Sequence, residues 1–599
     1  MKLHLTATLI FIASLMISTQ TSAQNSANVN FEVSFLHPQA HYAEMQMAIT
    51  NINAKSTTVK MPVWAPGSYL IREFSKNIEN FTAKSSAGKP INVQQTTKNS
   101  WVINTENQKS VVINYRVYAF EVSVRTSFVD ADHAFLSCPD IFMFVDKQLN
   151  QPVIVKINPI QGWKKISTSL EALPNKTNSF YAKNFDQLFD SPIEIGNQDI
   201  FYFEAAGVKH EVAMVNGGNY NTELLKTDMA KIVETATAIF GENPNKRYVF
   251  IVHNYAAGGG GLEHKNSTVL GATRLGYTDE NTYKGFLSLV AHEYFHLWNV
   301  KRLRPIALGP FNYDQENYTT NLWIAEGFTA YYENLISLKA KIINQTNFLA
   351  ELENDINAIA NQPGNKVQCL SEASFNAWIK YYRPNENSAN TSISYYNKGA
   401  LIATVINLTI LHHSEGKYSL DDAMQFAYNK YYKKLKRGYT DAEFRAVLEQ
   451  FAGKHLSFIY DNYINGTVDI DFSTYLGYAG LQIDDKNSGI STPYLGANAS
   501  FINNNLTIRN VATNSAAFLA GLNVNDKIVT IDGLKPDNLP QIISEKKVGD
   551  SLVFIVDRDG IEKNILVTLK ASRNKKFEIR KMDGASEFQL KVLAKWLGE

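Results

Sequence analysis

The sequence predicts a multidomain α+β chain in which a β-rich segment, a mainly helical segment and a second β-rich segment follow one another. Residues 28–200 contain short alternating runs such as Phe31–Phe35 and Val111–Tyr118, which predict the strands of an all-β domain, a sandwich. Residues 201–477 carry apolar residues at helical spacing, and residues 478–572 return to short strands. At 599 residues the chain is long enough for several domains, each with its own core.

The first 23 residues predict a secretory signal peptide. Lys2 supplies the positive start, Leu9–Ile17 forms a short apolar core, and Thr21-Ser22-Ala23 offers small residues for cleavage after Ala23. The apolar run is too short for a membrane-spanning helix in the mature protein, although an uncleaved signal anchor is the alternative. We expect an exported protein, periplasmic or secreted, with no stable membrane span.

Composition excludes one broad class of partner. The formal net charge is only +1, with 45% hydrophobic and 19% charged residues, so we expect no nucleic-acid partner. The two cysteines, Cys138 and Cys369, are too far apart in sequence for a metal knuckle. An oxidising compartment would permit a disulfide between them.

The middle segment carries the longest periodic patterns. A buried strand at Tyr248–Val252 precedes a glycine-rich turn. Helices are predicted at Lys284–Val300, Leu322–Lys339, Phe348–Asn361, Asn397–His412 and Thr440–Ala452.

The last part of the chain has its own pattern. Strands are predicted at Leu506–Val511, Lys527–Ile531, Ser551–Val556 and Asn564–Leu569. Asp559-Gly560 predicts a hairpin turn between the last two strands. The tail at 573–599 is charged and partly helical.

His292, Glu293 and His296 form a His-Glu-x-x-His pattern within one predicted helix. Residues four apart lie on one helical face, so both imidazoles can bind a single cation while Glu293 reaches its open position. Zinc suits this set, since imidazole plus carboxylate with one free position is a common catalytic zinc environment. We therefore predict one Zn²⁺, with His292 and His296 as ligands and Glu293 as general base.

A third ligand is expected from the next helical pattern. Glu326 lies in Trp323-Ile324-Ala325-Glu326-Gly327-Phe328, and it is the carboxylate that we assign to the metal. A His-Glu-x-x-His helix followed by Trp-x-x-Glu-Gly-Phe resembles the gluzincin metallopeptidases. Residues 297 to 325 intervene between His296 and Glu326, which is 29 residues and more than in the aminopeptidase N family.

The longer interval is similar to that of the glycyl aminopeptidases, the sixty-first metallopeptidase family. The run His296-Leu-Trp-Asn-Val-Lys-Arg-Leu-Arg-Pro305 and the run Trp64-Ala-Pro-Gly-Ser-Tyr69 are typical of that family. The resemblance covers roughly residues 30 to 570. It implies an N-terminal β-sandwich-like domain (28–200), a thermolysin-like, mainly helical zinc peptidase domain (201–477) and a C-terminal PDZ domain (478–572).

The PDZ resemblance has residues of its own. Pro493–Ala497 is similar to the carboxylate-binding loop, Ser515–Leu522 to the short helix, and Asp526–Gly533 to the strand that follows it. Such domains bind peptide C-termini along a sheet edge, so peptide ends are possible partners. A packing module with an unused groove is the alternative.

A glycine cluster predicts where the substrate backbone binds. Gly260 and Gly261 allow close approach of a ligand, and an edge strand there could pair with an extended peptide. Gly260-Gly261-Leu262-Glu263-His264 resembles the Gly-x-Met-Glu-Asn motif of gluzincin aminopeptidases. The resemblance implies that Glu263 binds the substrate α-amine, with His264 in place of the motif's Asn.

Tyr396 is the candidate for oxyanion stabilisation. Tyr395-Tyr396-Asn397-Lys398-Gly399 resembles the Tyr-x-Lys-Gly element of the same clan, which implies that the Tyr396 hydroxyl faces the developing oxyanion. Tyr395 is the neighbouring alternative.

These residues together predict a zinc aminopeptidase that removes N-terminal residues from peptides. Small residues such as Gly or Ala are what the family suggests. A zinc endopeptidase and a catalytically weak peptide-binding protein are the alternatives. Glu263 argues against the endopeptidase, because a buried carboxylate without a charged amine would penalise an internal peptide.

Overall fold

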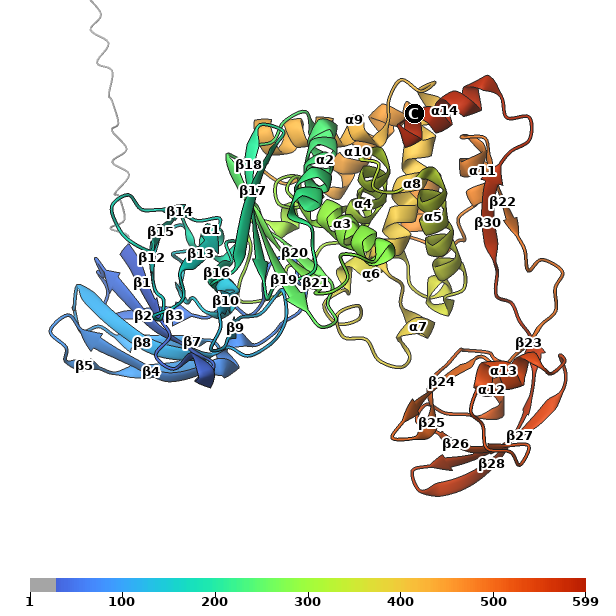
Figure 1. Cartoon of the computed structure of the whole chain (residues 1–599), viewed down its shortest axis with the longest axis horizontal. Helices are drawn as coiled ribbons and strands as arrows, with labels where there is room; N and C mark the ends of the chain where they lie inside the picture. Colours follow the sequence, from blue (N-terminus) through green and yellow to red (C-terminus); the bar gives the residue numbers. More distant parts are fainter. Residues whose placement is uncertain (1–27, 599) are drawn as a thin grey trace, which may run out of the picture.

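The computed structural model describes residues 28–598, so the predicted signal peptide at 1–23 lies outside the described residues. Three parts follow one another along the chain: a β-rich N-terminal domain, a central helical domain and a small C-terminal β domain (Figure 1). This arrangement confirms the predicted fold class. Across residues 28–598, the helices are too short or too polar to cross a membrane.

The N-terminal domain is built on three antiparallel or mixed sheets. The largest has the order β14 (Glu171–Ala172), β15 (Ser179–Ala182), β12 (Val153–Asn158), β1 (Asn28–Ser34), β2 (Tyr42–Thr50), β8 (Ser110–Tyr118), β4 (Ile78–Ser85), β5 (Pro90–Ile91). A second has the order β11 (Phe144–Val145), β3 (Ser56–Lys60), β7 (Ser100–Asn104), β6 (Val93–Thr97). The third has the order β13 (Lys165–Thr168), β16 (Ile193–Gly196), β10 (Ala134–Leu136), β9 (Phe128–Val129).

Alternation along the strands produces the sandwich. Every second residue of β1 and β8 is buried, so each strand presents one apolar face. Phe81 on β4 stacks on Trp101 on β7 at 5.1 Å between ring centroids, which packs the first sheet against the second. The domain is not purely β: a short helix, α1 (Phe185–Phe189), begins after Asn184, whose side chain caps it.

One loop of the N-terminal domain reaches the central domain. It carries the Trp64–Tyr69 motif, and the Trp64 indole donates a hydrogen bond to the Asn312 carbonyl at 2.8 Å. Val63 N donates to Tyr313 O at 2.9 Å. Gly67 in this loop has φ +91°, a conformation that side chains with a Cβ rarely adopt.

The central domain contains a mixed five-stranded sheet. Its order is β17 (Asp199–Ala205), β18 (Val208–Val215), β19 (Arg247–Tyr255), β21 (Ser267–Thr273), β20 (Gly261–Glu263), with β20 at the edge. Tyr248 and Phe250 face the helices, whereas Val249 and Ile251 pack with Val124 and other residues of the N-terminal domain. The sheet is therefore covered by helices on one face and by the N-terminal domain on the other.

Helices make up most of the central domain. The α-helices are α2 (Thr222–Phe240), α3 (Glu280–Phe295), α4 (Phe328–Lys339), α5 (Gln345–Ala360), α6 (Leu370–Phe375), α7 (Ser388–Thr391), α8 (Tyr395–His413), α9 (Leu420–Ala427), α10 (Asp441–Ala452) and α11 (Phe472–Gly477). Three π-helical turns are η5 (Trp323–Gly327), η7 (Tyr428–Lys434) and η8 (Ile459–Ile464).

Two helix predictions differ from the structure. Helix α3 ends at Phe295, whereas the periodicity predicted a helix to Val300. Val300 has φ +108°, so the chain turns sharply there although its side chains keep an apolar pattern. Helix α2 was not predicted. Asn221 caps its N-terminus and Gly241 ends it in a left-handed conformation.

The C-terminal β domain has its own core. Its sheet has the order β24 (Ala497–Ile502), β25 (Asn505–Val511), β26 (Lys527–Ile531), β27 (Ser551–Arg558), β28 (Ile561–Thr568), with α12 (Ala516–Ala520) and α13 (Leu539–Ser544) packed beside it. Arg558 pairs with Ile561, which confirms the hairpin turn at Asp559-Gly560. A small ribbon of β23 (Pro493–Tyr494) and β29 (Lys570–Ala571) lies at its boundary.

The tail returns to the central domain. Strand β22 (Leu481–Asp485), inside the range predicted for the PDZ domain, pairs with β30 (Phe577–Lys581) of the tail rather than with the PDZ sheet. Helix α14 (Glu587–Leu597) then packs on the central core, where the Trp596 indole donates to the Tyr331 hydroxyl at 3.1 Å. Both chain segments that lead to the C-terminal β domain are thus paired with each other (Figure 1).

Candidate metal and peptide site

Helix α3 carries His292 on its buried face, and His296, the C-cap residue, follows one turn later with helical backbone angles. Each imidazole is oriented by its Nδ1 atom: His292 Nδ1 lies 2.9 Å from Glu333 Oε2, and His296 Nδ1 lies 2.8 Å from the Asn299 carbonyl oxygen. These partners set both rings so that the Nε2 atoms face the same point.

Glu326 reaches that point from the π-helical turn η5. A π turn widens the helix by one residue and is common at functional sites. Gly327 and Gly399 let helix α8 pack closely against this turn, because a Cβ on Gly327 would lie 2.5 Å from the Gly399 Cα. The close contact places the N-terminal end of α8, with Tyr395 and Tyr396, beside Glu326.

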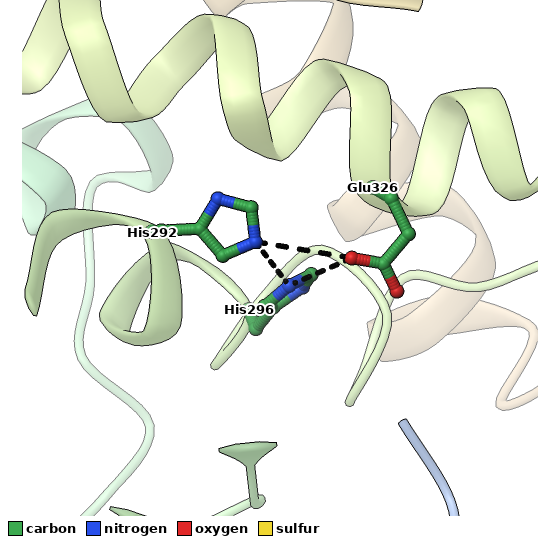
Figure 2. A group of neighbouring side chains, drawn as sticks. All are labelled: His292, His296 and Glu326. Carbon is green, nitrogen blue, oxygen red and sulfur yellow. Dashed lines mark hydrogen bonds and ion pairs between the residues drawn. The ribbon is translucent and has the colours of Figure 1, made fainter. Parts of the chain in front are cut away.

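The structure brings the three predicted ligands together (Figure 2). His296 Nε2 lies 3.2 Å from His292 Nε2 and 3.2 Å from Glu326 Oε2, and His292 Nε2 lies 3.8 Å from the same oxygen. Ligand atoms about 2.0–2.1 Å from a tetrahedral zinc would be about 3.3 Å apart. The donor set and its spacing therefore fit Zn²⁺.

The electrostatics of the three side chains favour a bound cation. All are buried, with exposures of 9%, 1% and 2% for His292, His296 and Glu326. Burial alone would raise the pKa of Glu326, but His296 and then His292 outweigh it and lower that pKa to about 2. Burial alone would lower the pKa of His292, but its contacts with Glu326 and Glu333 raise it well above its usual value. The carboxylates thus favour positive charge between them, which a metal supplies.

Glu293 lies beside the ligands with its carboxylate 4% exposed and with Oε2 unpaired within the described residues. Burial raises its pKa to about 7, against the opposing effect of the two histidines. Gly261 of β20 faces it so closely that a Cβ at position 261 would overlap the Glu293 carboxylate. The glycine therefore leaves this carboxylate open toward the edge strand.

Glu263 ends the edge strand β20 and is 4% exposed. Carboxylate oxygens of Glu263 and Glu293 and a ring nitrogen of His296 lie within 4.8 Å of one another. A Cβ on Gly67 would lie 2.5 Å from both Glu263 carboxylate oxygens. The N-terminal domain loop thus closes the end of the site at which Glu263 lies.

His264, next to Glu263, has a different set of contacts. Its Nδ1 lies 3.2 Å from Asp190 Oδ1, and the same oxygen pairs with Lys301 Nζ at 2.6 Å. Burial opposes the charge on Asp190, but Lys301 and then His264 outweigh it and hold the pKa of Asp190 below its usual value. His264 therefore belongs to a buried ion-pair cluster that joins the N-terminal and central domains.

The two tyrosines at the start of α8 differ in what they face. The centroid of the Tyr396 ring lies 6.3 Å from that of the His292 ring, and Tyr396 is half-buried. The Tyr395 ring is fully buried, and its hydroxyl has no hydrogen-bond partner among residues 28–598. The geometry favours Tyr396 over Tyr395. Lys398 of the same motif is buried and donates to Asn365 Oδ1 at 2.9 Å.

Three contacts at the site were not predicted. Tyr69 donates to Glu326 Oε1 at 3.2 Å, Gly67 abuts Glu263, and Glu333 holds His292. Glu333 follows Glu326 by seven residues, so it shares a helical face with it and could have been found by spacing. The Tyr69 and Gly67 contacts arise only from docking of the two domains.

Cys138 and Cys369 are both free. The buried Cys138 thiol donates to the Ser191 carbonyl at 2.9 Å, and Cys369 Sγ lies 3.4 Å from Ser371 Oγ.

Comparison with protein families gives three matches along the chain. Residues 30–197 match the peptidase M61 N-terminal domain, residues 285–402 match the M61 glycyl aminopeptidase, and residues 493–569 match a PDZ domain. A comparison with curated proteins gives no match.

Solved structures add a neighbour over nearly the whole length. The crystal structure of an aminopeptidase N family protein from Idiomarina loihiensis is 29% identical, with 95% of this chain and 100% of that chain covered and a TM-score of 0.88. An M1 zinc metallopeptidase from Deinococcus radiodurans is 12% identical over 72% of this chain and 92% of its own, with a TM-score of 0.47. Yeast LTA4 hydrolase is 14% identical over 75% and 67%, with a TM-score of 0.44.

The last two similarities are too low to bear on this chain. The M61 glycyl aminopeptidase match at residues 285–402 contains His292, His296 and Glu326. The chain carries an M61 N-terminal domain and an M61 glycyl aminopeptidase domain, and it is a zinc metallopeptidase with a C-terminal PDZ domain.

Proposed function

We propose that this metallopeptidase is an exported aminopeptidase that removes small N-terminal residues from peptides, with Glu293 as general base. The observation that carries the proposal is the position of Glu263. Its carboxylate lies within 4.8 Å of Glu293 and His296, so a substrate amine paired with it has only its first peptide bond beside the metal ligands.

His292, His296 and Glu326 would hold the zinc. When bound, zinc supplies Lewis-acid chemistry: it polarises a carbonyl and lowers the pKa of a water. The residues around the three ligands then have to bind the peptide, move a proton and stabilise charge.

The edge strand β20 orients the substrate. The Gly260 carbonyl accepts a hydrogen bond from Gly271 N at 2.8 Å, toward β21. Carbonyls alternate in direction along a strand, so the Gly261 carbonyl faces the edge away from β21, where Arg125 Nη2 donates to one of its two lone pairs. An extended peptide that lies along this edge places its amine at Glu263 and its first peptide bond at Glu293.

Glu293 takes the proton of the attacking water and returns it to the leaving amine. Its Oε2 has no partner in the described part of the chain, and its raised pKa of about 7 suits a group that both accepts and donates a proton near neutral pH. Tyr396 hydrogen-bonds the oxyanion that develops on the carbonyl, since its ring lies beside His292. Burial raises the pKa of its hydroxyl well above the usual value, so the hydroxyl keeps the proton that it donates.

The preference for a small first residue is supported by the loop of the N-terminal domain. Gly67 lies against Glu263, and Tyr69 donates to Glu326 from the same loop. This loop occupies the space beyond Glu263 and the substrate amine. A bulky side chain on the first residue of the substrate would therefore contact the loop. The signal-peptide pattern of residues 1–23 supports export.

We also propose that the PDZ domain binds peptide C-termini. Strand β24 is at the edge of its sheet, next to the Pro493–Ala497 loop, and an edge strand can pair with an added peptide.

The function is tested by turnover of glycyl, alanyl and leucyl amides and their N-acetylated forms, with and without a chelator. We expect hydrolysis of free-amine glycyl and alanyl amides that a chelator abolishes and zinc restores. Equal turnover of acetylated substrates would favour an endopeptidase, and binding without turnover would favour a peptide-binding protein.

A further inference from the structure

Arg125 lies beside the edge strand, and Arg72 lies near Arg125. Arg125 lies in the loop that leads from β8 to β9, and Arg72 follows the Trp64–Tyr69 motif. Within residues 28–598, Arg125 forms no ion pair, and Arg72 has only Glu121 at 3.9 Å. The Nε atom of each guanidinium is buried and finds no hydrogen-bond partner in the described chain.

Arg125 reaches the edge at which the peptide would pair. Its Nη2 donates to the Gly261 carbonyl at 3.0 Å, the carbonyl that faces away from β21. Gly261 also faces the Glu293 carboxylate, whereas Glu263 lies two residues further along β20. Arg125 therefore lies on the side of Glu293 away from Glu263 and the substrate amine. The substrate residues that follow the scissile bond would pass on this side.

Arg72 faces the same region from the motif loop. Its Nη2 donates to Ser68 Oγ at 3.0 Å, which fixes the side chain. Burial and then the nearby Arg125 lower the pKa of Arg72. The nearby Asp140 does not neutralise the pair by hydrogen bonding, because it accepts from the Ser127 amide and hydroxyl.

A cavity of about 520 Å³ opens beside these arginines. Its lining includes Arg72, Arg383 and Tyr382, the residues Thr126 and Ser127 that follow Arg125 in sequence, and the carboxylates of Glu121 and Asp140. The Tyr382 hydroxyl donates to the Gly67 carbonyl at 3.5 Å, so the cavity borders the loop that closes the amine end of the site.

We propose that Arg125, assisted by Arg72, binds a carboxylate of the substrate on the leaving side of the scissile bond. The inference rests on the proposed aminopeptidase activity and names its substrate class: short peptides with a free C-terminus, or peptides with an acidic residue just after the first. Guanidinium groups bind carboxylates through paired N–H donors, and a bound anion would also offset the repulsion between two neighbouring cations.

The test compares matched substrates in the zinc-loaded enzyme. Gly-Ala against Gly-Ala amide measures recognition of a C-terminal carboxylate. Gly-Asp amide against Gly-Asn amide measures recognition of an acidic side chain. Glycyl anilide carries neither carboxylate and reports the aminopeptidase activity alone.

We expect wild type to favour the charged member of at least one pair by about 10-fold or more in kcat/KM, the range of a hydrogen bond to a charged group. R125Q should abolish that preference, measured as the ratio of kcat/KM within each pair, and R72Q should reduce it. Glycyl anilide turnover measures the loss that all substrates share through the contact of Arg125 with Gly261. R116Q is the matched control, because Arg116 pairs with Glu79 on another sheet of the same domain. The R116Q enzyme should favour the charged substrates as strongly as wild type does.

Outcomes separate the two proposals. No turnover of any substrate, glycyl anilide included, overturns the aminopeptidase assignment itself. The carboxylate site is overturned if wild type shows equal kcat/KM for both members of each pair. It is also overturned if R125Q keeps the preference with an unchanged melting temperature.

Discussion

Tyr69 of the N-terminal domain donates a hydrogen bond to Oε1 of Glu326, a ligand of the proposed metal site in the central domain, at 3.2 Å. The carboxylate oxygen that faces the histidines is the other one, Oε2. The contact therefore orients a ligand from across a domain boundary without occupying its metal-binding oxygen.

Loss of this hydrogen bond should weaken metal binding. We expect Y69F to lower zinc affinity by about 10-fold or more, the range for partners that orient ligands. Competition with a chromogenic chelator measures it. Tyr118, exposed on β8, offers the matched control Y118F, which should bind zinc as wild type does. Equal affinities for Y69F and wild type would contradict the orienting role.

Gly67 should tolerate no side chain. A Cβ there would press on the Glu263 carboxylate, so we expect G67A to lower kcat/KM for glycyl amides by at least about 10-fold through displacement of the amine anchor. Gly88 has a similar φ of +81° with nothing within 4 Å of its position, so G88A imposes similar backbone strain in open space. G67A and G88A enzymes of equal activity would rule out this role for Gly67.

Glu293 should set the acid limb of the pH profile. A general base works only when deprotonated, so kcat/KM should rise with pH as Glu293 loses its proton. Burial raises its pKa to about 7, and bound zinc, being positive, lowers it. We expect the midpoint of the limb at or below pH 7. E293Q should retain zinc, measured by elemental analysis, and lose about 100-fold or more in kcat. An active, metal-loaded E293Q would refute the general-base assignment.

Asp190 should hold the two domains together. Its partner Lys301 is 7% exposed, so D190N would leave a buried ammonium unpaired and lower the free energy of unfolding by about 3–5 kcal/mol. Lys301 and His264 hold the pKa of Asp190 below its usual value, so this stabilisation is present above about pH 4 and is lost as pH falls. Denaturant unfolding should therefore show a smaller difference in the free energy of unfolding between D190N and wild type at pH 3 than at pH 7.

The control for that measurement is an exposed pair. Glu223 pairs with Lys226 on α2 with 82% of its side chain exposed, and E223Q should change stability by less than about 1 kcal/mol. A D190N protein as stable as E223Q would show that the Asp190–Lys301 pair contributes little.

Local pattern predicted the parts of this site that lie on continuous helices. His292, Glu293 and the C-cap residue His296 come to one face through their spacing at the end of α3. Glu326 lies in the next periodic segment and was assigned as the carboxylate of the Trp-x-x-Glu-Gly-Phe motif. The end of α3 was not predictable from periodicity, since Val300 keeps the apolar pattern while its backbone leaves the helix.

Contacts between domains could not be predicted from spacing. Tyr69 and Glu326 are 257 residues apart, and only docking of the N-terminal loop against the central domain makes them neighbours. The same holds for Gly67 and Glu263, and for Arg125 and Gly261. Glu333, by contrast, is one helical repeat from Glu326 and lay within reach of sequence reasoning.

The amine anchor is the centre of the functional assignment, and one substitution tests it most directly. E263Q keeps the shape of the side chain and removes its charge, so the zinc-loaded variant should show KM raised by about 10-fold or more for glycyl anilide. Its activity on N-acetylglycyl anilide should stay as low as that of wild type. An E263Q enzyme that hydrolyses glycyl anilide with wild-type KM, or that loses both activities equally, would contradict the assignment of this protein as an aminopeptidase anchored by Glu263.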